Sequence, residues 1–239
     1  MSVKSKFGQI VIPALPVNRR TFDILRHELT AWIARARNCL NPRYWWLVRE
    51  LREKTGLSIN LGSGGTGKPG WINVEIRKHK DTTICLDIRQ PLPFANCSAT
   101  RVLAEHVLEH LDFASDAISL AREVWRILEP GGTFRVVVPD CELFLQAYVS
   151  GRVDSWAALG WDLCNMPSDI YTPMHIINHT FHQDGEHLFG YDFDTLEFLL
   201  KRAGFSTVER RCFRECRDGD LAIDNEVHKP YSLYVDAIK

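Results

Sequence analysis

Short apolar runs alternate along the chain with longer segments whose apolar residues recur at the period of a helix. Runs rich in branched and aromatic residues, bounded by glycine, proline or polar residues, indicate strands. They lie at residues 57–61, 71–75, 83–87, 100–104, 133–138, 205–211 and 232–238. Residues 20–37 and 43–54 are predicted helices, separated at Asn41-Pro42 because the residue before a proline avoids the helical region.

Two further helices are predicted from their end signals. Ser115 is a candidate N-cap for the amphipathic segment that follows it. Asp194 and Glu197 form a capping-box pattern for a helix that ends at Ala203, with Gly204 directly after it. Strands that alternate with helices predict an α/β fold with a doubly wound, Rossmann-like, mainly parallel sheet.

Charge divides the chain into two parts. Residues 1–56 hold 11 Lys and Arg against 4 Asp and Glu, whereas residues 57–239 hold 18 against 26. We expect residues 1–56 to form a helical lid or cap on a domain that spans residues 57–239, with residues 141–190 inserted after the fifth strand on the acceptor side. The basic segment also carries tryptophans, so a peripheral contact with an anionic membrane surface is an alternative to a solvated cap.

Composition favours a cytoplasmic protein. The seven cysteines are scattered and form no CxxC pair, which is typical of a reducing compartment. No run approaches the roughly 18–20 apolar residues of a membrane span. The N-terminal apolar stretch is short and interrupted by Pro13 and Pro16, unlike a secretory signal. We expect no nucleic-acid partner, and the oligomeric state is not predicted.

Glycine and polar residues stand where the predicted strands end. In chain order they are Gly62, Ser63, Gly64, Glu75, Asp87, Glu105, His106 and Asp140. The carboxyl ends of parallel strands meet at one edge of a sheet, so these residues are expected to line one pocket. Glycine allows close backbone approach, and a carboxylate accepts hydrogen bonds from two ribose hydroxyls. The set therefore predicts a nucleoside pocket.

The glycine-rich segment GSGGTGK after the first strand has several interpretations. It agrees with the phosphate-binding pattern G-x-x-x-x-G-K, but that site needs Ser or Thr after Lys68, where Pro69 stands. It also agrees with the dinucleotide pattern G-x-G-x-x-G. Both sites need a helix directly after the loop, and the nine residues 62–70 leave too little room for one. A simple turn without a ligand is a third interpretation, and the polar residues at the other strand ends argue against it.

An ordered series of motifs resembles the class I S-adenosylmethionine (SAM)-dependent methyltransferases. It consists of INLGSG, GWINVE, LDIRQPLPF, AEHVLEHL, LEPGGTFRVVVPD and LLKRAGF, and covers about residues 57–140 and 185–239. More narrowly, the series is similar to predicted methyltransferases associated with surface-polysaccharide and lipopolysaccharide biosynthesis. The resemblance implies the methyltransferase type of Rossmann-like fold, with SAM as the cofactor. It departs from the family after Gly64, where most class I enzymes carry a helix.

The resemblance also implies roles for single residues. It places in contact with the cofactor Gly62, Ser63, Gly64, Glu75, Asp87, Ile88 and Glu105. Glu75 would accept the ribose hydroxyls, and Asp87 with the Ile88 backbone would meet the adenine edge. Glu105 and His106 would lie near the methyl-bearing sulfonium.

His106 is the first candidate for a general base. Because the methyl group of SAM is already activated, the protein must align donor and acceptor and remove a proton from a hydroxyl acceptor. Histidine titrates near working pH, which suits that proton transfer. A structural role at a strand–helix junction is the alternative. His110 would share the face of His106 if the stretch were helical, and is interpreted as a scaffold residue.

A second group of histidines lies in the predicted insertion. They are His175, His179, His182 and His187, and the resemblance suggests that they face the acceptor. His182 is the second candidate for a catalytic residue. Structural hydrogen bonding is one alternative. A metal site completed by Asp184 or Glu186 is another, although no known zinc pattern is present and no metal site is predicted.

The expected activity is transfer of a methyl group from SAM to a hydroxyl of a small molecule, glycan or glycolipid, in polysaccharide biosynthesis. The choice of acceptor rests on the resemblance alone. Two alternatives remain open. One is an ATP-binding protein that uses the GSGGTGK loop, and the other is a catalytically silent SAM-fold protein with a regulatory or assembly role.

Overall fold

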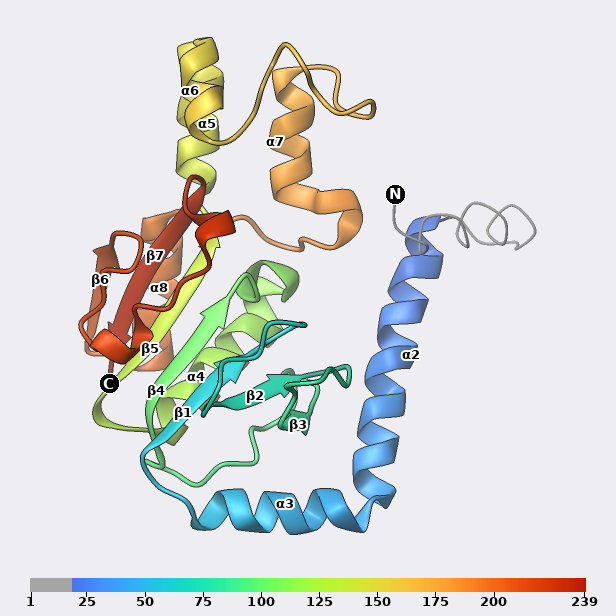
Figure 1. Ribbon diagram of the computed structural model, residues 1–239, viewed down its shortest axis with the longest axis vertical. Coiled ribbons are helices and arrows are strands. Elements are labelled where there is room, and N and C mark those ends of the chain that lie inside the picture. The colour runs from blue at the N-terminus through green and yellow to red at the C-terminus, as the bar shows by residue number, and fades with distance from the viewer. Residues whose placement is uncertain (1–18) are drawn as a thin grey trace.

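The computed structural model describes residues 19–239, with a seven-stranded sheet at its centre (Figure 1). The strands are β1 (Leu57–Leu61), β2 (Ile72–Glu75), β3 (Ile84–Cys85), β4 (Ala99–Glu105), β5 (Leu128–Pro139), β6 (Thr207–Arg211) and β7 (Ser232–Ile238). Their order is β3-β2-β1-β4-β5-β7-β6. The first five are parallel, and β7 is antiparallel to both neighbours. The predicted α/β fold with a Rossmann-like, mainly parallel sheet is confirmed.

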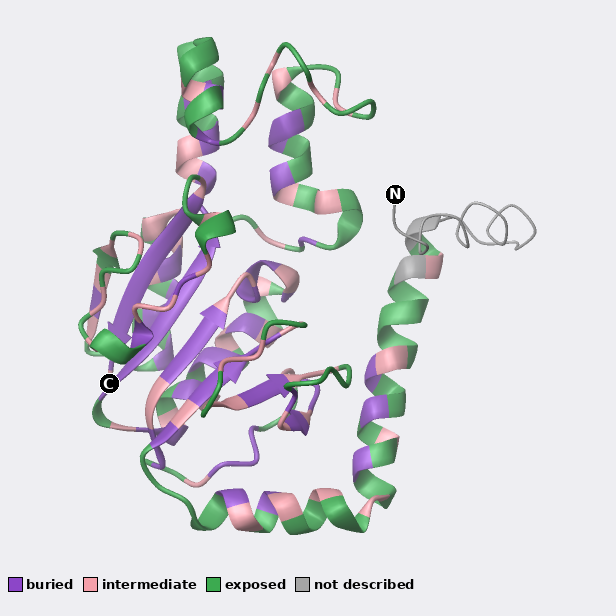
Figure 2. Cartoon of the chain, in the orientation of Figure 1, coloured by how far each residue is buried: buried purple, intermediate pink, exposed green. Residues whose placement is uncertain are grey.

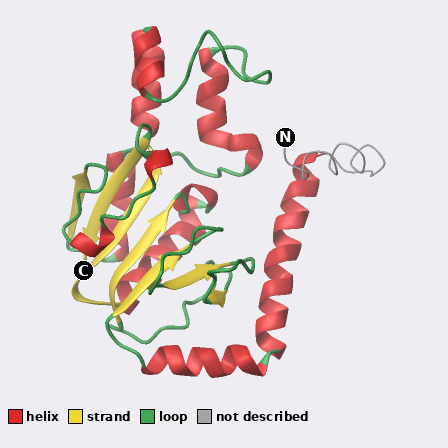
Figure 3. Ribbon diagram, in the orientation of Figure 1, coloured by secondary structure: helices red, strands yellow, loops and turns green. Residues whose placement is uncertain are grey.

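The helices lie around this sheet and beyond two of its edges (Figures 1 and 3). They are α2 (Arg19–Leu40), α3 (Pro42–Glu53), α4 (Ile118–Ile127), α5 (Cys141–Ser150), α6 (Val153–Ala158), α7 (Pro173–His182) and α8 (Phe193–Ala203). The connections of residues 62–71 and 76–83 contain no helix, as the short spacing after β1 predicted. No helix of residues 19–239 combines the length and apolarity needed to cross a bilayer.

Two helices start differently from the prediction. Asp112, not Ser115, is the cap, because its side chain accepts a hydrogen bond from Ser115 N at 3.0 Å. A π-helical turn over Phe113–Ala117 then precedes α4. Similarly, α8 is capped by Asp192 rather than Asp194. In both places an aspartate that lies two or three residues before the predicted cap accepts the hydrogen bond from a backbone N–H of the first helical turn.

The sheet has one apolar face and one face that carries a buried charge network. Phe134, Val136 and Val138 of β5 belong to the main core together with the buried residues of α4 and α8. Side chains alternate along a strand, so Arg135 faces the other side. It pairs there with Asp236 of β7 and with Asp224, and all three side chains are 0% exposed. Arg135 thereby holds the segment before β7 against the sheet.

The N-terminal helices extend along the margin of the sheet (Figure 1). Helix α2 is attached through Asn38, whose amide donates to Cys85 O at 2.7 Å, and through the buried Ala31 and Ala34. Most of its remaining surface is exposed (Figure 2). This region was predicted as a lid or cap over residues 1–56, of which the first 18 lie outside the described residues.

Helices α5, α6 and α7 have a small core of their own. It consists of Phe144, Ala147, Trp156, Leu159, Ile176 and Ile177, and is separate from the cluster under the sheet. These helices fall within the predicted insertion over residues 141–190. The insertion therefore packs largely on itself beyond the carboxyl end of β5 (Figure 1).

The turn after β1 depends on two glycines with left-handed backbone. Gly62 has a φ of +63° and Gly64 a φ of +54°. A Cβ atom on Gly62 would lie 2.5 Å from Cγ2 of Val107, whereas one on Gly64 would meet nothing within 4 Å. Both positions therefore favour glycine for its backbone conformation, but only at Gly62 does the side chain of Val107 also leave no room for a Cβ atom.

We expect alanine at either glycine to lower the free energy of unfolding by about 1–2 kcal/mol through backbone strain. Gly62→Ala should cost about a further 1–3 kcal/mol, because its methyl group overlaps Val107. Urea unfolding of Gly62→Ala, Gly64→Ala, Val107→Ala and Gly62→Ala/Val107→Ala measures this difference. Val107→Ala should cost less in the Gly62→Ala background than in the wild type. Equal losses at the two glycines would contradict the close approach of Val107 to Gly62.

Candidate active site

The ends of β1, β2 and β3 meet, as the sequence predicted. Ser63 N donates to Val74 O at 3.0 Å, and Leu86 N donates to Glu75 O at 3.0 Å. The side chain of Glu75 reaches back to the glycine loop, where its Oε2 accepts from Gly64 N at 2.9 Å. The candidate residues of these three strand ends therefore lie at one edge of the sheet.

Asp87 is engaged more fully than the sequence indicated. Its buried carboxylate accepts hydrogen bonds from the guanidinium groups of Arg35 on α2 and of Arg89. Burial alone would raise the pKa of Asp87, but the hydrogen bonds from Arg89 and Arg35 outweigh it and lower the pKa. Arg89 also pairs with Glu28 of α2 at 2.6 Å. Asp87 thus holds α2 at the sheet edge, while its predicted adenine contact stays a prediction. The neighbouring Ile88 packs against the main core.

Glu105, at the end of β4, joins the glycine loop to the segment before β7. Its Oε1 accepts from Asn225 N at 2.6 Å, and its Oε2 lies 4.0 Å from Lys68 Nζ. Lys68 also donates to Ile223 O at 2.9 Å. Burial raises the pKa of Glu105, against the opposing effects of Asn225 and Lys68. Lys68 therefore has internal partners, and no helix follows its loop, so the phosphate-binding interpretation gains no support.

His106 lies beyond β4 in a left-handed backbone conformation, with a φ of +54°. Its Nε2 is 2.9 Å from Ser232 Oγ, and its Nδ1 is 3.1 Å from Oε1 of Glu109. The ring stacks on His228 at a centroid distance of 3.8 Å. Burial and the neighbouring His106 lower the pKa of His228 to about 4. His106 is thus held from three sides.

Glu109 is the residue that the sequence analysis missed. Its side chain is 2% exposed, and neither carboxylate oxygen accepts a hydrogen bond of good geometry within the described residues. Each of Glu109, His110 and His187 offers one possible metal-ligand atom, and these three atoms lie within 4.8 Å of one another. The available signal was a glutamate three residues after His106 in an otherwise apolar stretch. The stretch is not helical from His106 onward, since the 3-10 turn starts at Leu108.

The histidines of the insertion do not gather into one site. His175 contacts Thr172 Oγ1 at 2.8 Å, and His179 lies edge-on to Trp161. His182 is exposed at the end of α7. His187 alone is buried, and burial lowers its pKa. The catalytic role of His182 stays a prediction.

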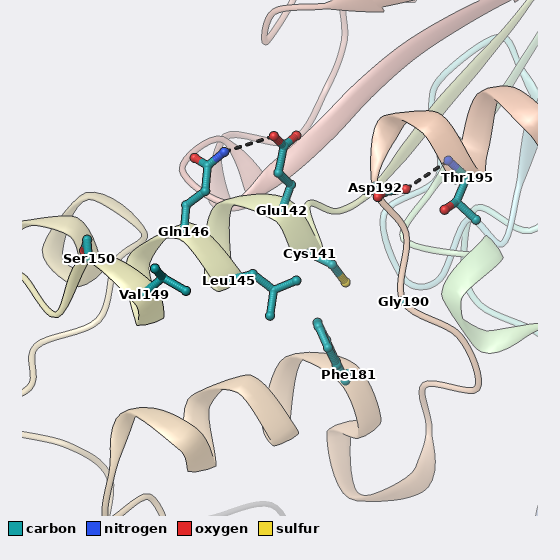
Figure 4. Close-up of a pocket in the computed structure, with 10 residues that line it drawn as sticks. All are labelled: Cys141, Glu142, Leu145, Gln146, Val149, Ser150, Phe181, Gly190, Asp192 and Thr195. Carbon is teal, nitrogen blue, oxygen red and sulfur yellow. Dashed lines mark hydrogen bonds between the residues drawn. The ribbon is translucent and has the colours of Figure 1, made fainter.

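A groove of about 710 Å³ lies between α5, α7 and the start of α8 (Figure 4). Leu145 of α5 and Phe181 of α7 point toward each other across it, and Asp192 borders one end. None of the predicted site residues lines this groove. The predicted cofactor residues and His106 instead lie at or follow the carboxyl ends of β1, β2, β3 and β4, whereas His182 lies at the end of α7.

Comparison with known proteins gives one family match. Residues 69–136 match the model of a family described as "Methyltransferase domain". No curated protein matches the chain.

Similar solved structures include a SAM-dependent methyltransferase from Archaeoglobus fulgidus, with 16% identity, 85% of this chain and 94% of that chain covered, and a TM-score of 0.46. Another is 1,6-didemethyltoxoflavin-N1-methyltransferase from Burkholderia thailandensis, solved with S-adenosylhomocysteine, with 10% identity, 94% and 91% coverage, and a TM-score of 0.46. Similarity of this degree carries no information on the activity of the present chain.

The matched segment starts at Pro69, directly after the glycine-rich segment, and runs through β2, β3, β4 and α4 into β5, so it includes the ends of β2, β3 and β4 but not the glycine loop. Within a mainly parallel sheet of this strand order, the match indicates a methyltransferase domain in this part of the chain.

Proposed function

We propose that this methyltransferase acts on a hydroxyl group of a glycan or glycolipid, with Glu75 binding the ribose of SAM and His106 accepting the proton of the acceptor. The observation that carries the proposal is the 2.9 Å contact between Glu75 and Gly64 at the strand ends, with Glu105 and His106 following the adjacent strand β4. The choice of a glycan or glycolipid rests on the motif resemblance and on the surface of α2 described below.

The residues of the glycine loop fit such a cofactor. Ser63 Oγ is buried and has no hydrogen-bond partner in the described part of the chain, so it is available to a ligand. Space is open beside Gly64, where a side chain would meet nothing within 4 Å. Glu75 accepts from Gly64 N through Oε2 at 2.9 Å and from Arg77 N through Oε1 at 3.3 Å, and each oxygen retains a second lone pair for a hydroxyl. When bound, SAM supplies an electrophilic methyl group.

His106 is suited to receive a proton. The carboxylate of Glu109 at its Nδ1 stabilises the imidazolium that forms, as a carboxylate does for a general base. Ser232 Oγ lies at Nε2, so the acceptor hydroxyl must displace this hydroxyl or pass its proton through it. Glu109 is a positioning residue here, because it acts through His106.

The outer surface of α2 supports a membrane-associated acceptor. Opposite the attached Ala31 and Ala34, the helix presents apolar residues at helical spacing that are 50–82% exposed. They are Leu25, Leu29, Trp32, Ile33 and Leu40. Exposed arginines, among them Arg37 and Arg43, lie on α2 and α3. An apolar stripe with flanking positive charge is complementary to an anionic lipid surface, and we propose that surface as its occupant.

Replacement of Glu75 by alanine should weaken SAM binding by about 1–3 kcal/mol through loss of charged hydrogen bonds. Glu75→Gln should fall between this variant and the wild type, because its amide keeps one acceptor. Isothermal titration with SAM measures the affinities, and Glu53→Ala on α3 is the control. Unchanged affinity in Glu75→Ala would contradict the proposed ribose contact.

Replacement of His106 by asparagine should lower turnover by about 10²–10⁴-fold and leave SAM affinity near that of the wild type. Asparagine is chosen because it tolerates the left-handed backbone at this position. Methyl transfer from labelled SAM to cell-envelope glycan and glycolipid precursors is the assay, with His182→Asn as the comparison. A parallel loss of affinity and turnover would make His106 a scaffold residue. Tight SAM binding without methyl transfer to any acceptor would favour a catalytically silent SAM-fold protein with a regulatory or assembly role.

The wild-type protein should sediment with phosphatidylglycerol vesicles and far less with phosphatidylcholine vesicles, and added salt should weaken the binding. Leu29→Ser/Trp32→Ser should reduce binding by at least about 10-fold, since each buried side chain contributes about 1.5–3 kcal/mol. Val149→Ser/Val153→Ser, which alters exposed apolar residues of the insertion, is the control. Concentration-dependent dimers without vesicle binding would assign the stripe to a second copy of the chain.

A further inference from the structure

The cluster of Glu109, His110 and His187 joins two segments that are distant in sequence. Glu109 and His110 lie in the 3-10 turn after β4, whereas His187 follows α7. Backbone hydrogen bonds connect the segments, because Glu109 O accepts from Leu188 N at 2.7 Å and from Phe189 N at 3.2 Å. The three side chains are thus brought together by main-chain contacts that do not involve the side chains themselves.

Both imidazole rings are oriented by backbone carbonyls. His110 Nδ1 lies 2.9 Å from Glu186 O, and His187 Nδ1 lies 2.7 Å from Thr180 O. A carbonyl oxygen only accepts hydrogen bonds, so Nδ1 carries the proton in each ring. In the neutral ring, Nε2 then keeps its lone pair. Metal-bound histidines are held in this way, with the second nitrogen donating to a carbonyl or carboxylate.

The carboxylate of Glu109 supplies the negative charge of the cluster. Its side chain is 2% exposed, and neither oxygen accepts a hydrogen bond of good geometry from the described residues. A buried carboxylate with a donor at only one of its two oxygens is costly, and a cation is one of the few groups that compensates the other oxygen. His106 Nδ1 lies 3.1 Å from Oε1, so the contacts leave Oε2 without a partner.

We propose that Glu109, His110 and His187 bind one divalent transition-metal ion. Two imidazoles and one carboxylate suit zinc, iron or cobalt, whereas magnesium and calcium prefer oxygen ligands only. Their ligand atoms already lie within 4.8 Å of one another, so small side-chain shifts complete the site. Three protein ligands leave at least one coordination position for water or another exchangeable ligand. The inference does not depend on the identity of the acceptor.

Zn²⁺ binding to the full-length, tag-free protein tests the proposal. The protein is stripped with a chelator and then titrated with Zn²⁺ in competition with a chromophoric chelator. One equivalent per chain is expected. His187→Ala and His110→Ala should each weaken binding by at least about 10–100-fold, the loss seen when mere partners of metal ligands are removed. His179→Ala and His182→Ala, which alter exposed histidines of α7, should bind like the wild type.

Two further measurements test the proposal even if the histidine variants do not fold. Glu109→Gln keeps the shape of the side chain but removes its charge, and should also lose Zn²⁺. X-ray absorption of the Zn²⁺-loaded wild type should show two imidazole ligands and otherwise oxygen ligands. Absence of stoichiometric binding overturns the proposal, as does equal loss in the His179 and His182 variants or a spectrum without imidazole. SAM titration of the same samples separates this result from the proposed function, which requires no metal.

Discussion

A charge withdrawn from water needs a partner inside the protein, and three such charges organise this molecule. Arg135 lies between Asp224 and Asp236 beneath the segment before β7. Asp87 lies between Arg35 and Arg89. Glu109 lies beside His106 and near two further histidines. Removing one partner from a buried pair leaves the other charge uncompensated, which costs several kcal/mol. The geometry of the site therefore depends on these polar contacts as well as on the apolar core.

Each of these charge networks attaches one part of the chain to the sheet. Arg135 ties down the chain that leads to Asn225 and His228, and these residues contact Glu105 and His106. Asp87 connects α2 to the sheet edge at which Glu75 lies. Glu109 connects the end of β4 to the end of the insertion. Helix α2, the end of β4, the end of the insertion and the segment before β7 thus surround the carboxyl end of the parallel strands.

Much of the fold was predictable because it depends on local patterns. The strands 57–61 and 232–238 were predicted with the bounds observed, and Gly204 ends α8 in the left-handed conformation. Helix starts were predicted less well, because Asp112 and Asp192 compete with Ser115 and Asp194 for the same donors. The helical spacing of His175, His179 and His182 did not indicate a cluster, since each side chain has a different environment on α7.

Because an apolar run that stops at a glycine or polar residue marks the end of a buried strand, the sequence by itself predicted the carboxyl ends of β1 and β2 as observed. It predicted those of β4 and β5 to within one residue, whereas β3 ends at Cys85 and not at Asp87. It thereby determined that Gly64 and Glu75 lie together. Only the tertiary structure decided which charges become buried. Asp87 is paired with Arg35, 52 residues away, and Glu109 lies near His187, which belongs to the insertion and is 78 residues away. Burial and pairing of this kind arise from long-range packing, which no local pattern of residues records.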